Sequence, residues 1–369
     1  MKIGILTYYG VFNHGAVLQA NALRRVICSL GHECTFLTFR RNYDFIPEDR
    51  ERKYNLSICS VGLYARYLRQ KGPANTLYNI KKHKVLNQYR QRALPMGQRY
   101  TDFSGDAAVI GSDEVFSTEI GVNPFFYGHG LRADRVISYG GSFGPTTLAG
   151  LREGRLEALV GSGLGAMDAV STRDRNSADI VKVLCNRDAT IVCDPVLLYG
   201  YEQEQRSFTP PERDYLLVYS YENNFNEPQE QAAVREYARK QGLRVFSVAY
   251  YHGWCDRNLQ ATPEELLGWI RNAALVVTDT FHGAVLSLVC NTPMVVKLRG
   301  NRNKLEFLMQ EYGLENRIID SFDAFAPIAD QPLDFASVNR QILIRRQASM
   351  TFLQSALERN AEKSERSSC

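Results

Sequence analysis

Polar residues that could do chemistry stand at several points directly after apolar runs, where a parallel strand would end. The clearest group is T-D-T-F-H-G, which begins at Thr278 and places His282 at the first turn of an expected helix. The N-terminus of a helix disfavours a protonated imidazole. Anions bound nearby can restore the pKa of such a histidine, so that it can donate a proton. His282 is therefore a candidate acid, and a capping or core histidine is the alternative interpretation.

The residues around this histidine supply further charge. Asp279 and Thr280 precede it and could orient its ring, and the basic run K-L-R-G-N-R-N-K follows at 297–304. Ammonium and guanidinium groups pair favourably with phosphate and carboxylate. We therefore expect an anionic ligand beside His282.

The loop before the first expected helix, Y-G-V-F-N-H-G-A, could bind an anion as well. Backbone N–H groups at a helix start, here around Asn13, His14 and Gly15, suit phosphate or carboxylate. The alternative is a tight turn in which Asn13 and His14 only cap the helix. The loop lacks G-x-G-x-x-G and G-K-[ST], and Arg40 stands where a dinucleotide site has an acid, which argues against NAD.

Two further strand ends carry charged residues. In I-G-S-D-E-V-F, Asp113 could orient a hydroxyl group or act as a base, or cap a helix together with Ser112. In S-T-R-D-R-N-S, Arg173 lies where a strand becomes a helix, and a guanidinium there suits a phosphate or carboxylate ligand. The alternative for Arg173 is an ion pair with Asp174 or Asp194.

Alternating strand and helix patterns must position these residues. Apolar strands are expected at 2–7, 33–39, 106–113, 135–140, 166–174 and 189–195, and then at 215–221, 243–250, 275–280 and 293–298. We predict an α/β protein with two doubly wound Rossmann-like domains, residues 1–205 and 206–333, followed by a helix and polar tail at 334–369. Ligands bind at the carboxyl ends of such strands, so a cleft between the domains is the expected site.

Composition limits the class of protein. The chain has 369 residues, 44% of them hydrophobic, and no apolar run near the ~18–20 residues of a membrane span. No signal peptide is expected at the N-terminus. Eight cysteines without a C-x-x-C pair argue against a zinc site or a disulfide framework and favour a reducing cytoplasm. We expect neither a metal nor another cofactor.

Residues 40–100 form a basic insertion in the first domain that is expected to be mostly helical. From Arg40 to Arg99 the chain has fourteen Lys or Arg against four Asp or Glu. Such a segment suggests an anionic partner, such as a membrane surface or a lipid-linked substrate. The alternative is a solvated helical face. Since no nucleic-acid-binding motif accompanies it, nucleic acid is not an expected partner.

Several motifs, taken in order, resemble the polysaccharide pyruvyl transferase family. They are N-H-G-A-V-L-Q-A (13–20), G-S-D-E-V-F (111–116), S-F-G (142–144), S-T-R-D (171–174), D-P-V-L-L (194–198), P-E-E-L (263–266) and D-T-F-H-G (279–283). The resemblance extends from Met1 to about Asp320. It implies two domains of the glycosyltransferase-B type that face a cleft.

The same resemblance implies a reaction. Pyruvate would pass from phosphoenolpyruvate to two hydroxyls of a sugar of galactose or N-acetylhexosamine type, forming a cyclic ketal and releasing phosphate, in surface polysaccharide biosynthesis. An acceptor on a lipid diphosphate carrier would bring residues 40–100 into peripheral contact with the inner face of the cytoplasmic membrane. The main alternative is a nucleotide-sugar glycosyltransferase of the same architecture, and a third is a carbohydrate-binding protein without turnover.

Residue roles follow as expectations, and the resemblance itself implies those of His282, Arg173 and Lys304. His282 transfers a proton, and Asp113 handles a hydroxyl proton. The donor-binding residues are expected to be Arg173, Lys304 or its competing match Arg302, Asn13, His14, Gly15, Thr280 and Phe281. The family often has G-S-D-Q-V-W-N where this chain has Glu114, Phe116 and Ser117, so stacking on the acceptor sugar would fall to Phe116, with Ser112 and Glu114 beside it.

Overall fold

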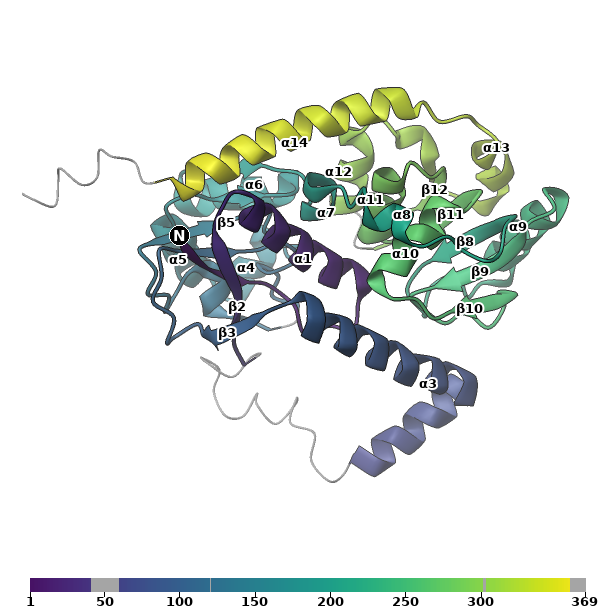
Figure 1. The fold of residues 1–369 in the computed structure, drawn as a ribbon, viewed down its shortest axis with the longest axis horizontal. Helices are drawn as coiled ribbons and strands as arrows, with labels where there is room; N and C mark the ends of the chain where they lie inside the picture. The colour runs from purple at the N-terminus through teal and green to yellow at the C-terminus, as the bar shows by residue number, and fades with distance from the viewer. Residues whose placement is uncertain (41–59, 120, 301–302, 359–369) are drawn as a thin grey trace, which may run out of the picture.

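The computed structural model describes residues 1–40, 60–119, 121–300 and 303–358 (Figure 1). Two parallel sheets lie side by side in it, one built from the first half of the chain and one from the second. Helices cover both faces of each sheet, and the predicted α/β class with two doubly wound, Rossmann-like halves is confirmed.

The first sheet has the strand order β3-β2-β1-β4-β5, and all of its pairs are parallel. Its strands are β1 (Lys2–Leu6), β2 (Glu33–Thr38), β3 (Met96–Arg99), β4 (Ala107–Ile110) and β5 (Arg135–Ser138). A bridge between Ile137 and Ala169 continues it toward the short pair β6 (Ser171–Thr172) and β7 (Thr190–Ile191). The helices of this half are α1 (His14–Ser29), α4 (Leu148–Glu153), α5 (Glu157–Ala166), α6 (Arg175–Cys185), α7 (Pro195–Tyr199) and α8 (Glu204–Ser207), with the 3-10 turn η1 (Pro124–Tyr127).

The second sheet has the order β10-β9-β8-β11-β12-β13 and is also parallel throughout. Its strands are β8 (Tyr215–Tyr219), β9 (Arg244–Val248), β10 (Arg257–Leu259), β11 (Leu275–Thr278), β12 (Met294–Lys297) and β13 (Ile318–Ile319). Its helices are α9 (Pro228–Lys240), α10 (Pro263–Arg271), α11 (Phe281–Cys290), α12 (Asn303–Glu311) and α13 (Phe325–Ala329), with 3-10 turns η2 (Glu315–Arg317) and η3 (Phe322–Ala324).

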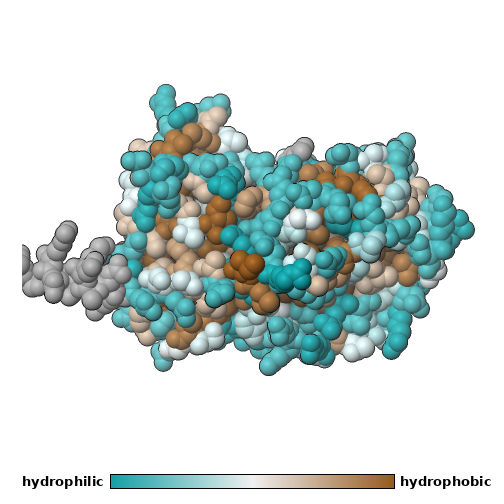
Figure 2. All heavy atoms as spheres, turned by 90° about the horizontal axis from the view of Figure 1, so that it is seen from above, coloured by the Kyte–Doolittle hydropathy of each residue, from teal (hydrophilic) through white to brown (hydrophobic). Residues whose placement is uncertain are grey.

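The last helix, α14 (Phe335–Leu357), returns from the second sheet to the first half of the chain (Figure 1). There Ser349 accepts a hydrogen bond from the backbone N–H of Cys193 at 2.9 Å. From above, hydrophobic side chains appear as separate patches among hydrophilic ones (Figure 2). Leu343 and Ile344 of α14 are exposed.

The two halves share one apolar core. A single cluster of buried residues joins Val17 of α1 and Val196 of α7 to Leu266 of α10 and Val285 of α11. Burying apolar side chains across the junction stabilises one fixed arrangement of the halves. The expected cleft is therefore closed at its base, and only its rim remains open to a ligand.

The described part of the basic insertion is a helix that links the two halves. This helix, α3 (Ser60–Ala93), bends at Gly72, where φ is 76°, just before Pro73. Its Tyr78 hydroxyl donates to the carbonyl of Leu259 at 2.9 Å, and its Lys82 ammonium donates to the carbonyl of Ala249 at 3.1 Å.

Part of the positive charge of the basic insertion is neutralised by contacts of α3 within the protein. Lys82 is only 6% exposed, and Lys71 pairs with Glu222 of the second half at 2.6 Å. Arg92 likewise pairs with Glu264 at 2.8 Å. These three cations contact carboxylates or carbonyls of the protein, whereas Lys81 and Lys84 on the same helix are exposed. The basic residues at 41–59 lie outside the described part, and membrane contact there stays a prediction.

Candidate active site

A pocket of about 200 Å³ lies where the two sheets direct their strand ends toward each other. Its lining residues are Tyr8, Val11, Asn13, Ala16, Asp113, Glu114, Tyr221, Phe281, His282 and Lys304. They follow the carboxyl ends of β1 and β4 in the first sheet and of β8 and β11 in the second, apart from Lys304 on α12. Each of these strand pairs is the point where the strand order reverses, which is where doubly wound sheets bind ligands.

His282 lies in the pocket wall at the first turn of α11, as expected. It is 7% exposed, and its Nε2 has no hydrogen-bond partner. Burial lowers the pKa of the imidazole; the carboxylate of Asp113 counteracts this, and the cations Arg173 and Lys304 add to the lowering. The ring is therefore neutral at neutral pH without a ligand, and a bound anion would favour its protonation.

Helix α1 meets this histidine through Gly15. A Cβ atom placed on Gly15 would lie 2.3 Å from Cγ of His282. This close approach requires glycine and brings the start of α1 against the start of α11. The predicted donor residue Gly15 therefore lies directly against His282.

The capping interpretation holds for Asn13. Its side-chain oxygen accepts hydrogen bonds from the N–H groups of Gly15 at 2.9 Å and Ala16 at 3.4 Å. Thr280 similarly caps α11 by accepting a hydrogen bond from the N–H of Gly283 at 3.0 Å. Asn13 still lines the pocket, whereas Thr280 does not.

His14, a predicted donor-binding residue, does not reach the pocket. Its Nε2 lies 2.9 Å from the carbonyl oxygen of Ala261, and the residue is buried. Burial lowers the pKa of His14 to about 4. The buried, neutral imidazole of His14 forms a contact between the two halves. The assignment of His14 to the donor site is therefore wrong in this structure.

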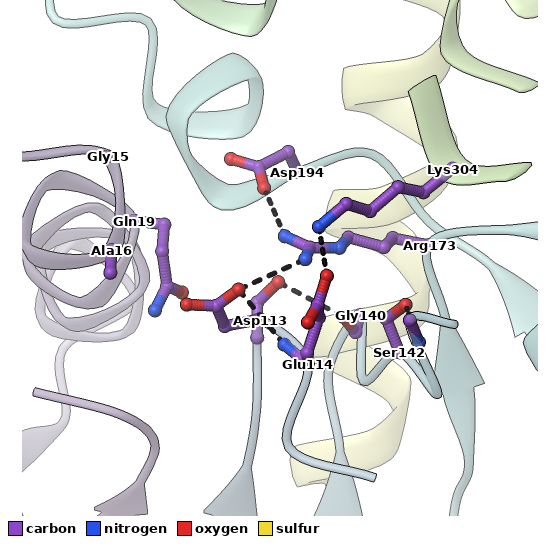
Figure 3. Close-up of polar contacts among 12 residues, drawn as sticks. Gly15, Ala16, Gln19, Asp113, Glu114, Gly140, Ser142, Arg173, Asp194 and Lys304 are labelled. Atoms are coloured by element: carbon purple, nitrogen blue, oxygen red, sulfur yellow. Dashed lines mark hydrogen bonds and ion pairs between the residues drawn. The ribbon is translucent and has the colours of Figure 1, made fainter. Parts of the chain in front are cut away.

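Arg173 is not among the residues that line the pocket, and it lies between Asp113 and Asp194 (Figure 3). The guanidinium is buried and pairs with Asp113 at 3.2 Å and with Asp194 at 3.1 Å. Its Cζ also lies 4.4 Å from the ring centroid of Phe281, which lines the pocket. The alternative of an ion pair with Asp194 is therefore observed, and in this structure Arg173 touches no open space where a donor could sit.

Asp113 presents the carboxylate that Arg173 neutralises. Its side chain is 16% exposed and lines the pocket. Burial alone would raise the pKa of this carboxyl, but Arg173, His282 and Lys304 together bring it below its ordinary value. Asp113 is therefore ionised at neutral pH and can accept a hydrogen bond from a hydroxyl group.

Lys304 is the cation that reaches the pocket from the basic run at 297–304. It pairs with Glu114 across the junction of the two halves (Figure 3). Arg299 pairs instead with Asp279 at 2.7 Å and with Glu230 at 3.0 Å. Asp279 is thus engaged by Arg299 and does not orient His282. Arg302 lies outside the described residues.

Two predicted acceptor residues are in the wrong place to touch a ligand. Phe116 is 0% exposed and packs with Phe143, whose ring centroid is 5.3 Å away, because its strand end turns into the core of the first half. Ser112 is buried as well, and its hydroxyl donates to the carbonyl of Gly140 at 3.0 Å. The predictions that both contact the sugar are therefore wrong, and only Glu114 of that group lines the pocket.

Several lining residues were missed from the sequence. Tyr8, Val11 and Ala16 were part of a recognised loop, but no pattern showed which of its side chains point inward. Tyr221 follows β8 and is 45% exposed. An aromatic residue at the carboxyl end of a strand beside the reversal point was the signal that could have identified it.

Within the described part of the chain, no group of three or more His, Cys, Asp or Glu residues could hold a metal ion. None of the helices described is both long and apolar enough to cross a membrane.

Comparison with known proteins gives the family. The model of the polysaccharide pyruvyl transferase family matches residues 13–298, which include Asp113, Arg173 and His282. The chain belongs to this family. This pyruvyl transferase family member is therefore a transferase enzyme of polysaccharide pyruvylation, with a saccharide acceptor. Lys304 lies beyond the matched residues.

One solved structure supports the fold, and two others are reported as similar. This family member is similar to the glycosyltransferase of kitacinnamycin, with 13% identity, coverage of 97% of this chain and 98% of the other, and a TM-score of 0.50. The spinosyn rhamnosyltransferase SpnG with thymidine diphosphate has 11% identity, coverage of 97% and 100%, and a TM-score of 0.49. The UDP-GlcNAc 2-epimerase of Methanocaldococcus jannaschii has 12% identity, coverage of 90% and 93%, and a TM-score of 0.49. A comparison with curated proteins found no significant match.

Proposed function

We propose that this enzyme transfers pyruvate from phosphoenolpyruvate to two hydroxyls of a pyranose acceptor, forming a cyclic ketal and releasing phosphate. The observation that carries the proposal is the pairing, in one small pocket, of a buried histidine with an ionised carboxylate and an ammonium group. The donor is an anion, the reaction begins with a proton, and the acceptor supplies hydroxyl groups. Each of these demands has a matching group in the pocket wall.

The donor would bind on the side of Lys304 and His282. The ammonium of Lys304 is held by a carboxylate in the free enzyme, and a phosphate or carboxylate of the donor would compete for it. Negative charge beside His282 would raise the pKa of its imidazole and favour the protonated form. Donor binding would then produce the acid that the first step needs.

The proposed chemistry balances without a further reactant. Protonated His282 gives its proton to the methylene carbon of the donor, and the adjacent carbon becomes electrophilic. A sugar hydroxyl adds to that carbon and loses its proton to Asp113, which passes it to the departing phosphate. The second hydroxyl then adds to the same carbon and returns a proton to His282. A weak base such as Asp113 is sufficient, because a hydroxyl becomes strongly acidic as it adds to a cationic carbon.

Arg173 would act through Asp113 in this scheme. Its ion pair keeps that carboxylate ionised and fixed, so that Arg173 is a positioning residue and not a direct donor ligand. We propose galactose-type or N-acetylhexosamine-type acceptors, with lipid-linked ones among them, and peripheral contact of the enzyme with the inner face of the membrane. No cofactor is needed for the proposed steps.

The test is phosphate release from phosphoenolpyruvate with and without galactosyl and N-acetylmannosaminyl acceptors, free and lipid-linked. We expect acceptor-dependent release that falls by about 10²–10⁴-fold in His282→Ala, as for loss of a general acid. Acceptor-dependent release that is undiminished in His282→Ala would remove the histidine from the mechanism. A requirement for a nucleotide sugar in place of phosphoenolpyruvate would favour the alternative, a glycosyltransferase.

A further inference from the structure

One aromatic side chain in the pocket is unlike the others. Tyr221 exposes 45% of its surface, whereas Tyr8 and Phe281 in the same wall expose 3% and 5%. A tyrosine that keeps nearly half of its surface in water at a pocket rim gains little from the core. Its exposed ring is an apolar surface that a ligand can cover.

The ring of Tyr221 is supported from behind. It meets Tyr250 edge-on, with ring centroids 5.2 Å apart, and Tyr250 in turn lies 6.1 Å from Tyr219 at a right angle. The ammonium of Lys82, from α3, lies 4.5 Å from the centroid of Tyr250. This arrangement ties the aromatic group to the helix that joins the two halves.

The backbone beside Tyr221 is fixed as well. The next residue, Glu222, accepts a hydrogen bond from Asn79 at 3.2 Å and pairs with Lys71 at 2.6 Å, both on α3. A side chain with two rotatable bonds on a fixed backbone loses little conformational entropy when a ligand covers it. Tyr221 is therefore suited to act as a rigid binding surface.

The charges near Tyr221 indicate what kind of ligand it can bind. The carboxylates of Asp113 and Glu114 line the same pocket as Tyr221. Burial raises the pKa of the Tyr221 phenol, these carboxylates and Asp279 raise it further, and Arg173 partly offsets the rise. Such surroundings disfavour the anionic donor. They suit a neutral molecule with hydroxyl groups that donate to carboxylates and with an apolar face.

We propose that Tyr221 forms the acceptor subsite, where the C–H face of a pyranose ring stacks on the phenol ring while its hydroxyls face Asp113. This inference rests on the proposed function, since it assigns the second substrate of that reaction. It replaces the stacking role expected for Phe116, which the fold buries. It also divides the pocket into a donor side at Lys304 and His282 and an acceptor side at Tyr221.

The test compares Tyr221→Ala and Tyr221→Phe with the wild-type enzyme. The matched control is Tyr251→Ala, because Tyr251 packs on Tyr78, with ring centroids 5.8 Å apart, and does not line the pocket. In phosphate-release assays, we expect Tyr221→Ala to raise KM for the pyranose acceptor by about tenfold, the loss of one aromatic contact, with KM for phosphoenolpyruvate unchanged. Tyr221→Phe keeps the ring and should stay within about twofold of wild type.

A second readout separates this inference from the proposed reaction. Saturation-transfer NMR of a galactoside with each protein measures sugar binding whether or not the donor is correct, and we expect the ring-proton signals to be lost only in Tyr221→Ala. Unchanged sugar binding and unchanged acceptor KM in a folded Tyr221→Ala protein would overturn the acceptor subsite. A rise in KM for phosphoenolpyruvate alone would place Tyr221 on the donor side and overturn it as well. Absence of any phosphate release, with sugar binding that still depends on Tyr221, would overturn the reaction and support the subsite.

Discussion

Replacement of Gly15 by alanine tests whether the contact between α1 and α11 sets the position of His282. The added Cβ would lie 2.3 Å from Cγ, 2.4 Å from Cβ and 2.7 Å from Nδ1 of His282. Carbon atoms in contact prefer separations of about 3.5–4.0 Å, so the ring or the helix must move by about 1 Å. A displacement of that size at a reacting group costs on the order of 10²-fold in rate. Overpacking of a buried junction also costs about 1–3 kcal/mol of stability.

The assay for Gly15→Ala is acceptor-dependent phosphate release, with urea unfolding measured in parallel. Gly10→Ala is the matched control: the glycine is in the same loop, and a Cβ on it would meet no atom within 4 Å. We expect Gly10→Ala to retain wild-type kcat and Gly15→Ala to lose about 10²-fold while remaining folded. A Gly15→Ala enzyme with kcat within twofold of Gly10→Ala would refute the argument that this contact positions the histidine.

Three further predictions concern stability. Arg173→Ala leaves the buried carboxylates of Asp113 and Asp194 unpaired and should cost about 3–5 kcal/mol in urea unfolding at pH 7; a loss below 1 kcal/mol would contradict the buried ion pair. His14 has a folded-state pKa of about 4 against 6.5 in the unfolded chain, so the unfolded state binds more protons as pH falls between these values, and stability is lost. As the pH falls from 6.5 to 4, the free energy of unfolding of His14→Gln should therefore decrease by about 3 kcal/mol less than that of the wild type. Parallel pH profiles of the two proteins would contradict this. Tyr78→Phe removes the hydrogen bond from α3 to the second half and should lower the free energy of unfolding by about 1 kcal/mol, measured by calorimetry. An unchanged free energy of unfolding would mean that this bond does not help to hold α3 on the second half.

The local parts of the fold were predictable because they depend on short stretches of sequence. The apolar run before Asp113 is β4, and the run before Thr280 is β11, each close to its expected bounds. Strand ends in parallel sheets point the same way, so the meeting of Asp113 and His282 in one pocket followed from the pattern of strands. The capping role of Asn13 could likewise be predicted from its residue type.

Other features depend on contacts between residues that are distant in the sequence, and they could not be predicted from it. Phe116 was expected to face a sugar, but which side of its turn enters the core is decided by packing against Tyr127 and Phe143. The basic residues of α3 were expected to face a solvent or membrane surface, but some of them have partners more than a hundred residues away along the chain, as Lys71 has in Glu222. Charge counts along a sequence do not show which cations a fold neutralises.

Arg173 shows how such a distant contact changes a functional interpretation. From its motif alone it is a ligand for an anionic donor, yet its guanidinium already binds two carboxylates that belong to the protein. A second anion would have to displace a buried pair, which is costly because the freed carboxylate would remain in a poorly solvated place. A role that keeps both ion pairs is to hold Asp113 in its ionised form. In the proposed reaction, the donor would compete with Glu114 for the ammonium of Lys304, and the hydroxyls of the acceptor would face the carboxylate of Asp113, so that one pocket could hold two substrates of different charge.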